Sequence, residues 1–235
     1  MPQMLNLTDP LTLEALAQVS TEGLVPSQQP TPRWLLQQAD CYLQYFLKYP
    51  DLAVCHSHAE YLYYILLEID PDVSAFVPQP FKLKISGQRK AYIPDCYVVR
   101  KGQPQVIELK APGGMDDPKW KALTAFFNWH NLPFSLISNE AVLEREQEAL
   151  HWLPIIQALV YANDLAVDTQ VIEREQYAKI LDAHTLQLSD LLTPGLRTEQ
   201  WRDEVAFYRL MYSHHIDVNL QDAPLDWSTE VSVCC

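Results

Sequence analysis

The sequence lacks any long apolar run. No stretch of its 235 residues approaches the roughly 18 to 20 uncharged apolar residues of a membrane span. Residues 1–12 also lack the charged-then-apolar pattern of a secretory signal. These absences exclude a transmembrane class and favour an intracellular location. The apolar content of 48% is enough for a large folded core.

Paired cysteines are also missing. The five cysteines form no Cys-x-x-Cys pair and no other zinc-ligand spacing. An odd number of cysteines in a reducing compartment indicates free thiols. The cysteines therefore give no sign of a disulfide framework or a zinc finger, and the sequence shows no internal repeat.

Basic residues are scarce, and they are unevenly distributed. Residues 1–143 carry 11 Lys and Arg against 14 Asp and Glu, whereas residues 144–235 carry 6 against 16. A protein that grips nucleic acid by its phosphates needs Lys and Arg at the contact surface. The C-terminal part is therefore unsuited to DNA, and its acidic surface favours a basic protein partner.

Two acids and a lysine stand out on two short apolar segments, 92–99 and 105–110, which a polar turn joins. A turn centred on Lys101-Gly102 makes facing residue numbers sum to 203, so Asp95 faces Glu108. Pro104 lacks an N–H, which leaves this register open by a residue or two. Alternation places Lys110 on the side of Glu108 and turns the intervening apolar residues inward.

Two carboxylates facing each other across a hairpin can share one hard cation. The alternative is an exposed hairpin whose acids and lysine form a surface ion pair of about 0–1 kcal/mol. A basic patch next to this hairpin could contact phosphates, or it could be an ordinary solvated hairpin. Its members are Lys82, Lys84, Arg89 and Lys90.

The remaining pattern predicts an α/β protein. Residues 1–33 are expected to form an extended leader, rich in Ser, Gln and Pro from residue 20. Helical periodicity covers 34–48, 57–69 and 118–130, and strands are expected near Val77 and over 81–85, 91–99, 105–110 and 133–138. The order of helix, three-strand meander over 81–110, helix and strand indicates a core with a mixed sheet.

The pattern changes from Glu144 onward, which divides the chain into a domain of residues 34–143 and another of 144–235. Helices are predicted near 144–161, 169–183, 187–192 and 198–214, followed by a small hairpin over 216–233. Helices that end in a hairpin resemble a winged-helix module.

Glu60 offers a third acid on the helix that precedes the meander. It lies three residues after Ser57, so it also fits a capping box at the start of that helix. Capping the helix and joining Asp95 and Glu108 as a third acid compete for one carboxylate. The family resemblance described next favours the second role.

Several segments resemble the TnsA endonuclease subunit of heteromeric cut-and-paste transposases, a branch of the restriction-endonuclease-like PD-(D/E)xK superfamily. They are Ser57-His-Ala-Glu60 with the apolar helix after it, Tyr92-Ile-Pro-Asp95, Ile107-Glu-Leu-Lys110, residues 120–138, and the C-terminal stretch from Phe207 to Thr229. The resemblance covers roughly residues 50–235. It implies a restriction-endonuclease-like mixed-sheet core followed by a mostly helical, winged-helix-like C-terminal domain.

The resemblance also implies a reaction, hydrolysis of DNA at the 5′ ends of a transposon. Asp95, Glu108 and Glu60 would hold Mg²⁺, for which Mn²⁺ can substitute, with the Leu109 carbonyl as a further oxygen ligand. Lys110 would orient the attacking water or stabilise developing charge, and these roles are not separated. Glu60, Asp95, Glu108 and Lys110 are thus the expected catalytic residues.

The partners implied are transposon-end DNA, a TnsB-like transposase that cuts the 3′ ends, and a TnsC-like AAA+ ATPase bound by the acidic C-terminal domain. The location implied is the bacterial cytoplasm, in association with the nucleoid. Two alternatives stay open. The chain could be a standalone nuclease for repair or restriction, or a non-catalytic assembly adaptor.

Overall fold

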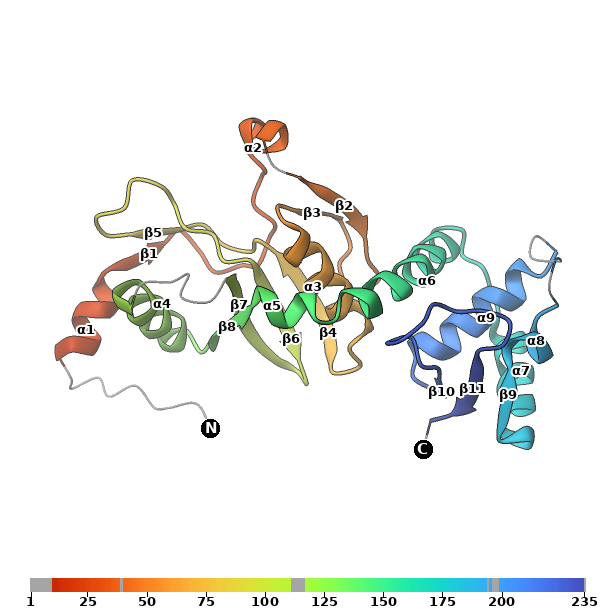
Figure 1. The fold of residues 1–235 in the computed structure, drawn as a ribbon. Helices are drawn as coiled ribbons and strands as arrows, with labels where there is room; N and C mark the ends of the chain where they lie inside the picture. Colours follow the sequence, from red (N-terminus) through yellow and green to blue (C-terminus); the bar gives the residue numbers. More distant parts are fainter. Residues whose placement is uncertain (1–9, 39, 111–116, 194, 196–198, 235) are drawn as a thin grey trace. The chain divides into compact units, whose positions relative to one another are not determined.

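In a computed structural model the chain forms two compact units, which we describe separately (Figure 1). The structure describes residues 10–38, 40–110, 117–193, 195 and 199–234. Unit 1 comprises the described residues up to Gln44 together with 48–67 and 72–144. Unit 2 comprises residues 45–47 and 68–71 and the described residues from Arg145 onward. Helices and mixed sheets make this a mixed α/β protein.

The centre of unit 1 is a four-stranded sheet in the order β4-β6-β7-β8. The first three strands are antiparallel neighbours, and β8 runs parallel to β7. Helix α3 (His58–Ile69) precedes β4, and helix α4 (Asp117–Trp129) connects β7 to β8. The expected succession of a helix, three antiparallel strands, a helix and a strand is present, but the first of the three strands is β4 and not segment 81–85. The strands are β4 (Val73–Pro78), β6 (Cys96–Arg100), β7 (Gln103–Lys110) and β8 (Phe134–Ser138).

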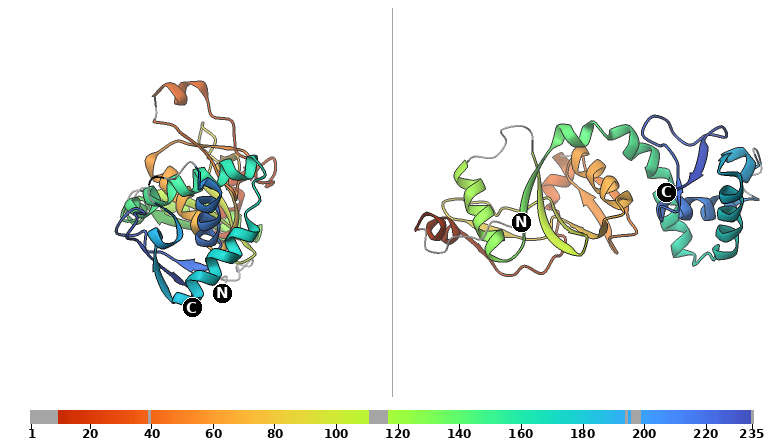
Figure 2. Two further views of the ribbon diagram at one scale, coloured as in Figure 1. Left: turned by 90° about the vertical axis from the view of Figure 1, so that its right-hand side faces the viewer. Right: turned by 90° about the horizontal axis from the view of Figure 1, so that it is seen from below.

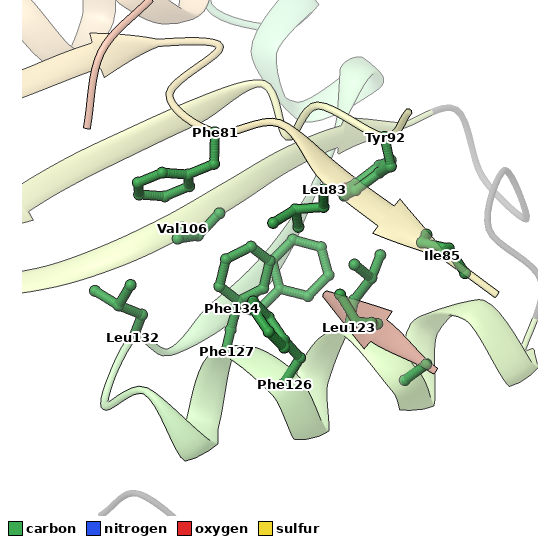
Figure 3. Close-up of a cluster of buried hydrophobic side chains, with 12 residues drawn as sticks. Phe81, Leu83, Ile85, Tyr92, Val106, Leu123, Phe126, Phe127, Leu132 and Phe134 are labelled. Carbon is green, nitrogen blue, oxygen red and sulfur yellow. The ribbon is translucent and has the colours of Figure 1, made fainter. Parts of the chain in front are cut away.

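Helices α3 and α4 lie on opposite sides of this sheet (Figure 2). On the α4 side, Phe127 lies 5.1 Å from Phe134 between ring centroids, and both belong to a buried cluster that also contains Val106 (Figure 3). On the α3 side, Tyr64 stacks on Phe76 of β4 at 5.7 Å. Both faces of the sheet are therefore covered by apolar packing, which fixes the strands that carry the acids.

The meander uses a different first strand from the one we expected. Segment 81–85 forms β5 (Leu83–Ile85), but β5 pairs with β1 (Val19–Thr21) and joins the next segment only by a bridge between Leu83 and Tyr92. Strand β6 starts at Cys96 rather than at residue 91. The prolyl nitrogen of Pro94 has no hydrogen to donate to a ladder, which is the physical reason for the late start.

The N-terminal region also differs from the prediction of an extended leader. Helix α1 (Pro10–Ala17) packs beside α4, and Val19 of β1 is buried in the core cluster. The helix expected over 34–48 is wrong beyond its start. Helix α2 (Arg33–Gln38) ends early, and β2 (Tyr42–Tyr45) pairs with β3 (Leu52–Cys55). Short apolar runs fit periods of 2 and 3.6 almost equally, so strand pairing decided the outcome.

Unit 2 follows α5 (Asn139–Leu143) and is mostly helical, as expected. Its three-stranded antiparallel sheet has the order β10-β11-β9, so the predicted hairpin gains a third strand. The elements are α6 (Glu146–Asp164), α7 (Gln170–Ala183), β9 (Thr185–Gln187), α8 (Leu188–Leu191), α9 (Trp201–Tyr212), β10 (Ile216–Asp217) and β11 (Glu230–Val233).

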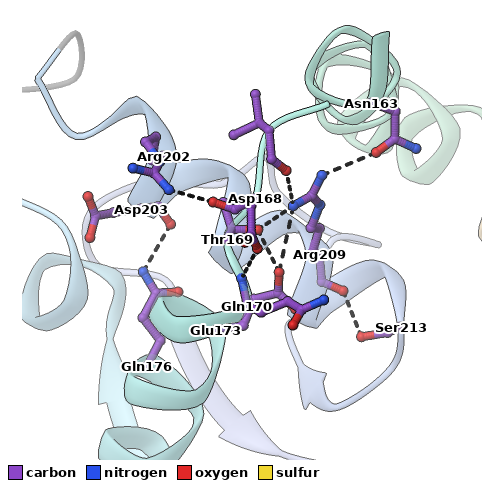
Figure 4. Close-up of polar contacts among 11 residues, drawn as sticks. Asn163, Asp168, Thr169, Gln170, Glu173, Gln176, Arg202, Asp203, Arg209 and Ser213 are labelled. Carbon is purple, nitrogen blue, oxygen red and sulfur yellow. Dashed lines mark hydrogen bonds and ion pairs between the residues drawn. The ribbon is translucent and has the colours of Figure 1, made fainter. Parts of the chain in front are cut away.

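Arg209 of α9 holds the loop between α6 and α7 in place (Figure 4). Its guanidinium donates to the Val167 carbonyl at 2.8 Å, to Asn163 Oδ1 at 3.2 Å and to the hydroxyl of Thr169. A planar guanidinium with five fixed donors suits such a set of acceptors.

None of the helices in the described part of the chain is both long enough and apolar enough to cross a membrane. This agrees with the lack of a long apolar run in the sequence.

Candidate active site

The hairpin of β6 and β7 has the register that the sequence predicted. Cys96 pairs with Ile107 and Arg100 with Gln103, so facing residues sum to 203. Lys101 and Gly102 have φ angles of 50° and 72°, which is typical of a two-residue turn whose twist matches the strands. Asp95, one residue before β6, is therefore placed opposite Glu108.

Pro104 does not disturb this register. The N–H of Val106 donates to the Pro133 carbonyl at 2.8 Å, so even-numbered residues of β7 direct their nitrogens toward β8. Because β8 pairs with β7 only from Val106 onward, the nitrogen of Pro104 has no strand beside it. The missing N–H of Pro104 therefore removes no hydrogen bond from the sheet.

Glu108 is the most deeply buried acid of the site, with its side chain 2% exposed. Its Oε1 lies 2.8 Å from Lys110 Nζ, and its Oε2 accepts a hydrogen bond from the hydroxyl of Tyr92. Burial lowers the pKa of Lys110, but the hydrogen bond and charge of Glu108 outweigh it and leave that pKa above its usual value. Lys110 is therefore a charged donor at neutral pH.

Asp95 is held through its backbone and its side chain. Its carbonyl accepts from the Tyr64 hydroxyl at 2.7 Å and from the N–H of Gln79 at 2.8 Å. Its Oδ2 accepts from the N–H of Leu109 at 2.6 Å. Burial, followed by the charges of Glu108 and Glu60, raises the pKa of Asp95 well above its usual value.

Glu60 caps α3, and its charge also reaches Asp95. Its Oε1 accepts from the Ser57 hydroxyl at 3.1 Å, and its Oε2 accepts from the N–H of His56 at 3.0 Å. The N–H of Glu60 in turn donates to the Ser57 hydroxyl at 3.2 Å, which caps α3. The same carboxylate is close enough for its charge to raise the pKa of Asp95. Capping and membership of the acidic site are thus compatible.

The chemistry of these donors fits a hard divalent cation. Asp95, whose charge is repelled by those of Glu108 and Glu60, and these two acids offer carboxylate oxygens, the donors that Mg²⁺ and Mn²⁺ prefer. The N–H of Leu109 faces Asp95, and a strand residue directs its C=O to the same side, so the Leu109 carbonyl also faces Asp95.

The arrangement is not a ready-made cage. Among the residues that the structure describes, no group of three or more His, Cys, Asp or Glu side chains stands close enough to hold a metal ion. Hydrogen bonds and the ion pair from within the protein engage the carboxylates of Glu60, Asp95 and Glu108. Coordination by all three would therefore require some of these side chains to turn.

The four basic residues that the sequence singled out are all exposed: Lys82, Lys84, Arg89 and Lys90. Lys84 lies 3.8 Å from Glu22 across the β1–β5 pair, a weak ion pair because both side chains are largely in solvent. The segment connects to the acidic site through the bridge between Leu83 and Tyr92. The structure thus links this basic segment to the site by way of Tyr92.

Two residues of the site were not expected from the sequence. Tyr92 binds Glu108, and Lys119 of α4 places Nζ 4.4 Å from the centroid of the Tyr92 ring. The only signal for Tyr92 was its place in the Tyr-x-Pro-Asp run. For Lys119 there was none, because only the packing of α4 on the sheet brings it to the hairpin.

No protein-family model matches the chain, and none of the curated proteins matches it either. Its fold defines it as a mixed α/β protein with a buried acidic site beside a lysine.

Proposed function

We propose that this chain is a divalent-cation-dependent DNA endonuclease, the TnsA-like subunit of a transposase that hydrolyses DNA at the 5′ ends of a transposon. The observation that carries the proposal is the β6–β7 hairpin. It places Asp95 opposite Glu108 and joins Glu108 to Lys110 at 2.8 Å. Two acids and a lysine in this arrangement are typical of nucleases of the PD-(D/E)xK superfamily.

The fold supports the same proposal. A helix, three antiparallel strands, a helix and a parallel strand form a core that resembles restriction endonucleases. Unit 2 resembles a winged helix in the order of its elements, which is α7, β9, α8, α9, β10 and β11. Strand β11 lies in the middle of its sheet. The combination of these two units supports a TnsA-like protein.

The residues divide the chemistry of phosphodiester hydrolysis among them. Asp95, Glu108, Glu60 and the Leu109 carbonyl would hold Mg²⁺ or Mn²⁺, which when bound neutralises phosphate charge and activates water. Lys110, charged and fixed by Glu108, is placed to orient a water molecule or to donate to a phosphate oxygen. Tyr92 keeps Glu108 in one orientation.

Partner proteins are part of the proposal, because unit 2 is poorly suited to DNA. Half of the side chains of α9 are buried and only Arg202 is exposed, which argues against this helix as a recognition helix in a DNA groove. Arg202 and Arg209 bind backbone oxygens of unit 2 itself. We assign the acidic unit 2 to a TnsC-like AAA+ ATPase, and DNA contact at the transposon end to Lys82, Lys84, Arg89, Lys90 and a TnsB-like transposase.

The test is a reconstituted transposition reaction that reports cutting of each strand separately. Asp95→Asn and Glu108→Gln are expected to abolish 5′-strand cutting and to leave 3′-strand cutting by the partner intact. Asp51→Asn is the matched control, because Asp51 is an exposed acid of the same unit. Unchanged 5′ cutting in both variants would refute the assignment, and cutting of plain DNA by the chain alone would favour a standalone nuclease.

A further inference from the structure

Gln79 lies directly after β4, between two prolines, and is only 4% exposed. Its φ angle of 44° is in the left-handed region, which residues other than glycine rarely adopt. Such a conformation persists where the surroundings determine it, and it is found more often at functional sites than elsewhere.

Both acids that come from outside β7 are hydrogen-bonded to this one residue. The N–H of Gln79 donates to the Asp95 carbonyl at 2.8 Å, and its Nε2 donates to Glu60 Oε2 at 3.1 Å. Nε2 also lies 2.8 Å from His56 Nδ1, and since an amide nitrogen only donates, that ring nitrogen accepts. Gln79 therefore sets the start of α3 and the start of β6 at a fixed separation.

The other half of the Gln79 amide has no partner. Its Oε1 is buried and makes no hydrogen bond within the described part of the chain. The amide cannot simply be turned over, because its oxygen would then face the carboxylate of Glu60, which accepts and cannot donate. A buried acceptor beside an acidic site marks a position for a donor, and water is the smallest one.

We propose that Gln79 is a positioning residue of the acidic site. It fixes the carboxylate of Glu60 relative to the backbone of Asp95, and its Oε1 accepts a hydrogen bond from a water molecule carried by the divalent cation. Mg²⁺ and Mn²⁺ in protein sites commonly keep part of their water shell, so such an acceptor would favour the hydrated ion. The inference rests on the proposed function, because it presupposes that the acids bind a cation.

The experiment is a Mn²⁺ titration of the 235-residue chain without DNA, in which electron paramagnetic resonance measures the free ion. Gln79→Met keeps the length of the side chain and removes both halves of the amide. We expect it to weaken Mn²⁺ binding about tenfold or more, the usual effect of removing a residue that orients metal ligands. Gln88→Met is the matched control, since Gln88 is exposed in the turn after β5.

A second variant separates this role from a purely structural one. Gln79→Glu keeps an oxygen at the Oε1 position but sets a carboxyl group against Glu60, so repulsion in the cation-free site increases. The rise in melting temperature on adding Mn²⁺ should therefore be smaller than wild type in Gln79→Met and larger in Gln79→Glu. A structural role would lower the melting temperature of both variants in EDTA and leave the Mn²⁺-dependent rise unchanged.

The outcomes also distinguish this inference from the proposed function. If Asp95→Asn and Glu108→Gln weaken Mn²⁺ binding but Gln79→Met binds the ion as wild type does, only the role of Gln79 is overturned. If the wild-type protein binds no Mn²⁺, or if Asp95→Asn and Glu108→Gln bind it unchanged, the cation site itself is refuted and this inference with it.

Discussion

Neutralising Asp95 should make the cation-free protein more stable at neutral pH. The pKa of this carboxyl is raised by burial and by the charges of Glu108 and Glu60, so its ionised form opposes folding. Each pKa unit corresponds to about 1.4 kcal/mol, and we expect Asp95→Asn to raise the free energy of unfolding by about 1 kcal/mol or more in EDTA. Asn still offers an oxygen to the N–H of Leu109.

The pH dependence gives this prediction a definite sign. Between the usual Asp pKa of about 3.9 and the raised value, folded protein keeps a proton that the unfolded chain has released. Wild-type stability therefore falls as pH rises through that window. Asp95→Asn lacks this loss, so its advantage should appear above about pH 4, grow with pH and then level off.

Urea unfolding at a series of pH values in EDTA measures both effects, with Asp51→Asn as the control for an exposed acid. Asp95→Ala should fall below Asp95→Asn by about 1–3 kcal/mol, because the Leu109 N–H loses its acceptor. Adding Mg²⁺ should stabilise wild type by about 2.7 kcal/mol at 100 times its Kd and leave Asp95→Asn nearly unchanged. A less stable Asp95→Asn at neutral pH, or an advantage independent of pH, would refute the reasoning.

Three further predictions concern single contacts. Tyr92→Phe removes the donor to the buried carboxylate of Glu108 and should cost about 1.5–3 kcal/mol by urea unfolding in EDTA, whereas Tyr97→Phe, the control, should change little. Lys110→Met leaves Glu108 without its ion partner and should lower the free energy of unfolding by up to about 3 kcal/mol. In a double-mutant cycle, adding Glu108→Gln should restore most of this loss. In unit 2, Arg209→Ala should cost about 2–3 kcal/mol, and faster amide exchange across residues 163–169 would locate the effect in the loop that this arginine holds.

The hairpin with the two acids could be predicted from sequence because its determinants are local. A two-residue turn at Lys101-Gly102 fixes the pairing of every residue behind it, and both residues have the positive φ angles that such a turn requires. The same alternation accounts for Cys96, which follows Asp95 on the strand, faces the other way and is fully buried. One turn and a period of two were enough to place Asp95 against Glu108.

What could not be predicted depends on partners distant in sequence. The strand over 81–85 was expected to pair with its neighbour, yet β1, more than 60 residues earlier, supplies the partner of β5. Gln79 carries no pattern at all, because its contacts to Glu60 and Asp95 exist only once α3 and β6 are assembled. Propensity and periodicity describe single segments, whereas these contacts arise from tertiary packing.

Glu60 shows why the acidic site and the fold are difficult to separate. The carboxylate that caps α3 through Ser57 and His56 also raises the pKa of Asp95, so a change in its position alters both helix and site. Hydrogen bonds at the helix start compensate part of the repulsion among the acids, and the remainder lowers the stability of the protein without a cation. The acidic site therefore lowers the stability of the cation-free protein, and stable folding elsewhere in the protein offsets that loss. This is expected where acids are grouped for binding or catalysis rather than for stability.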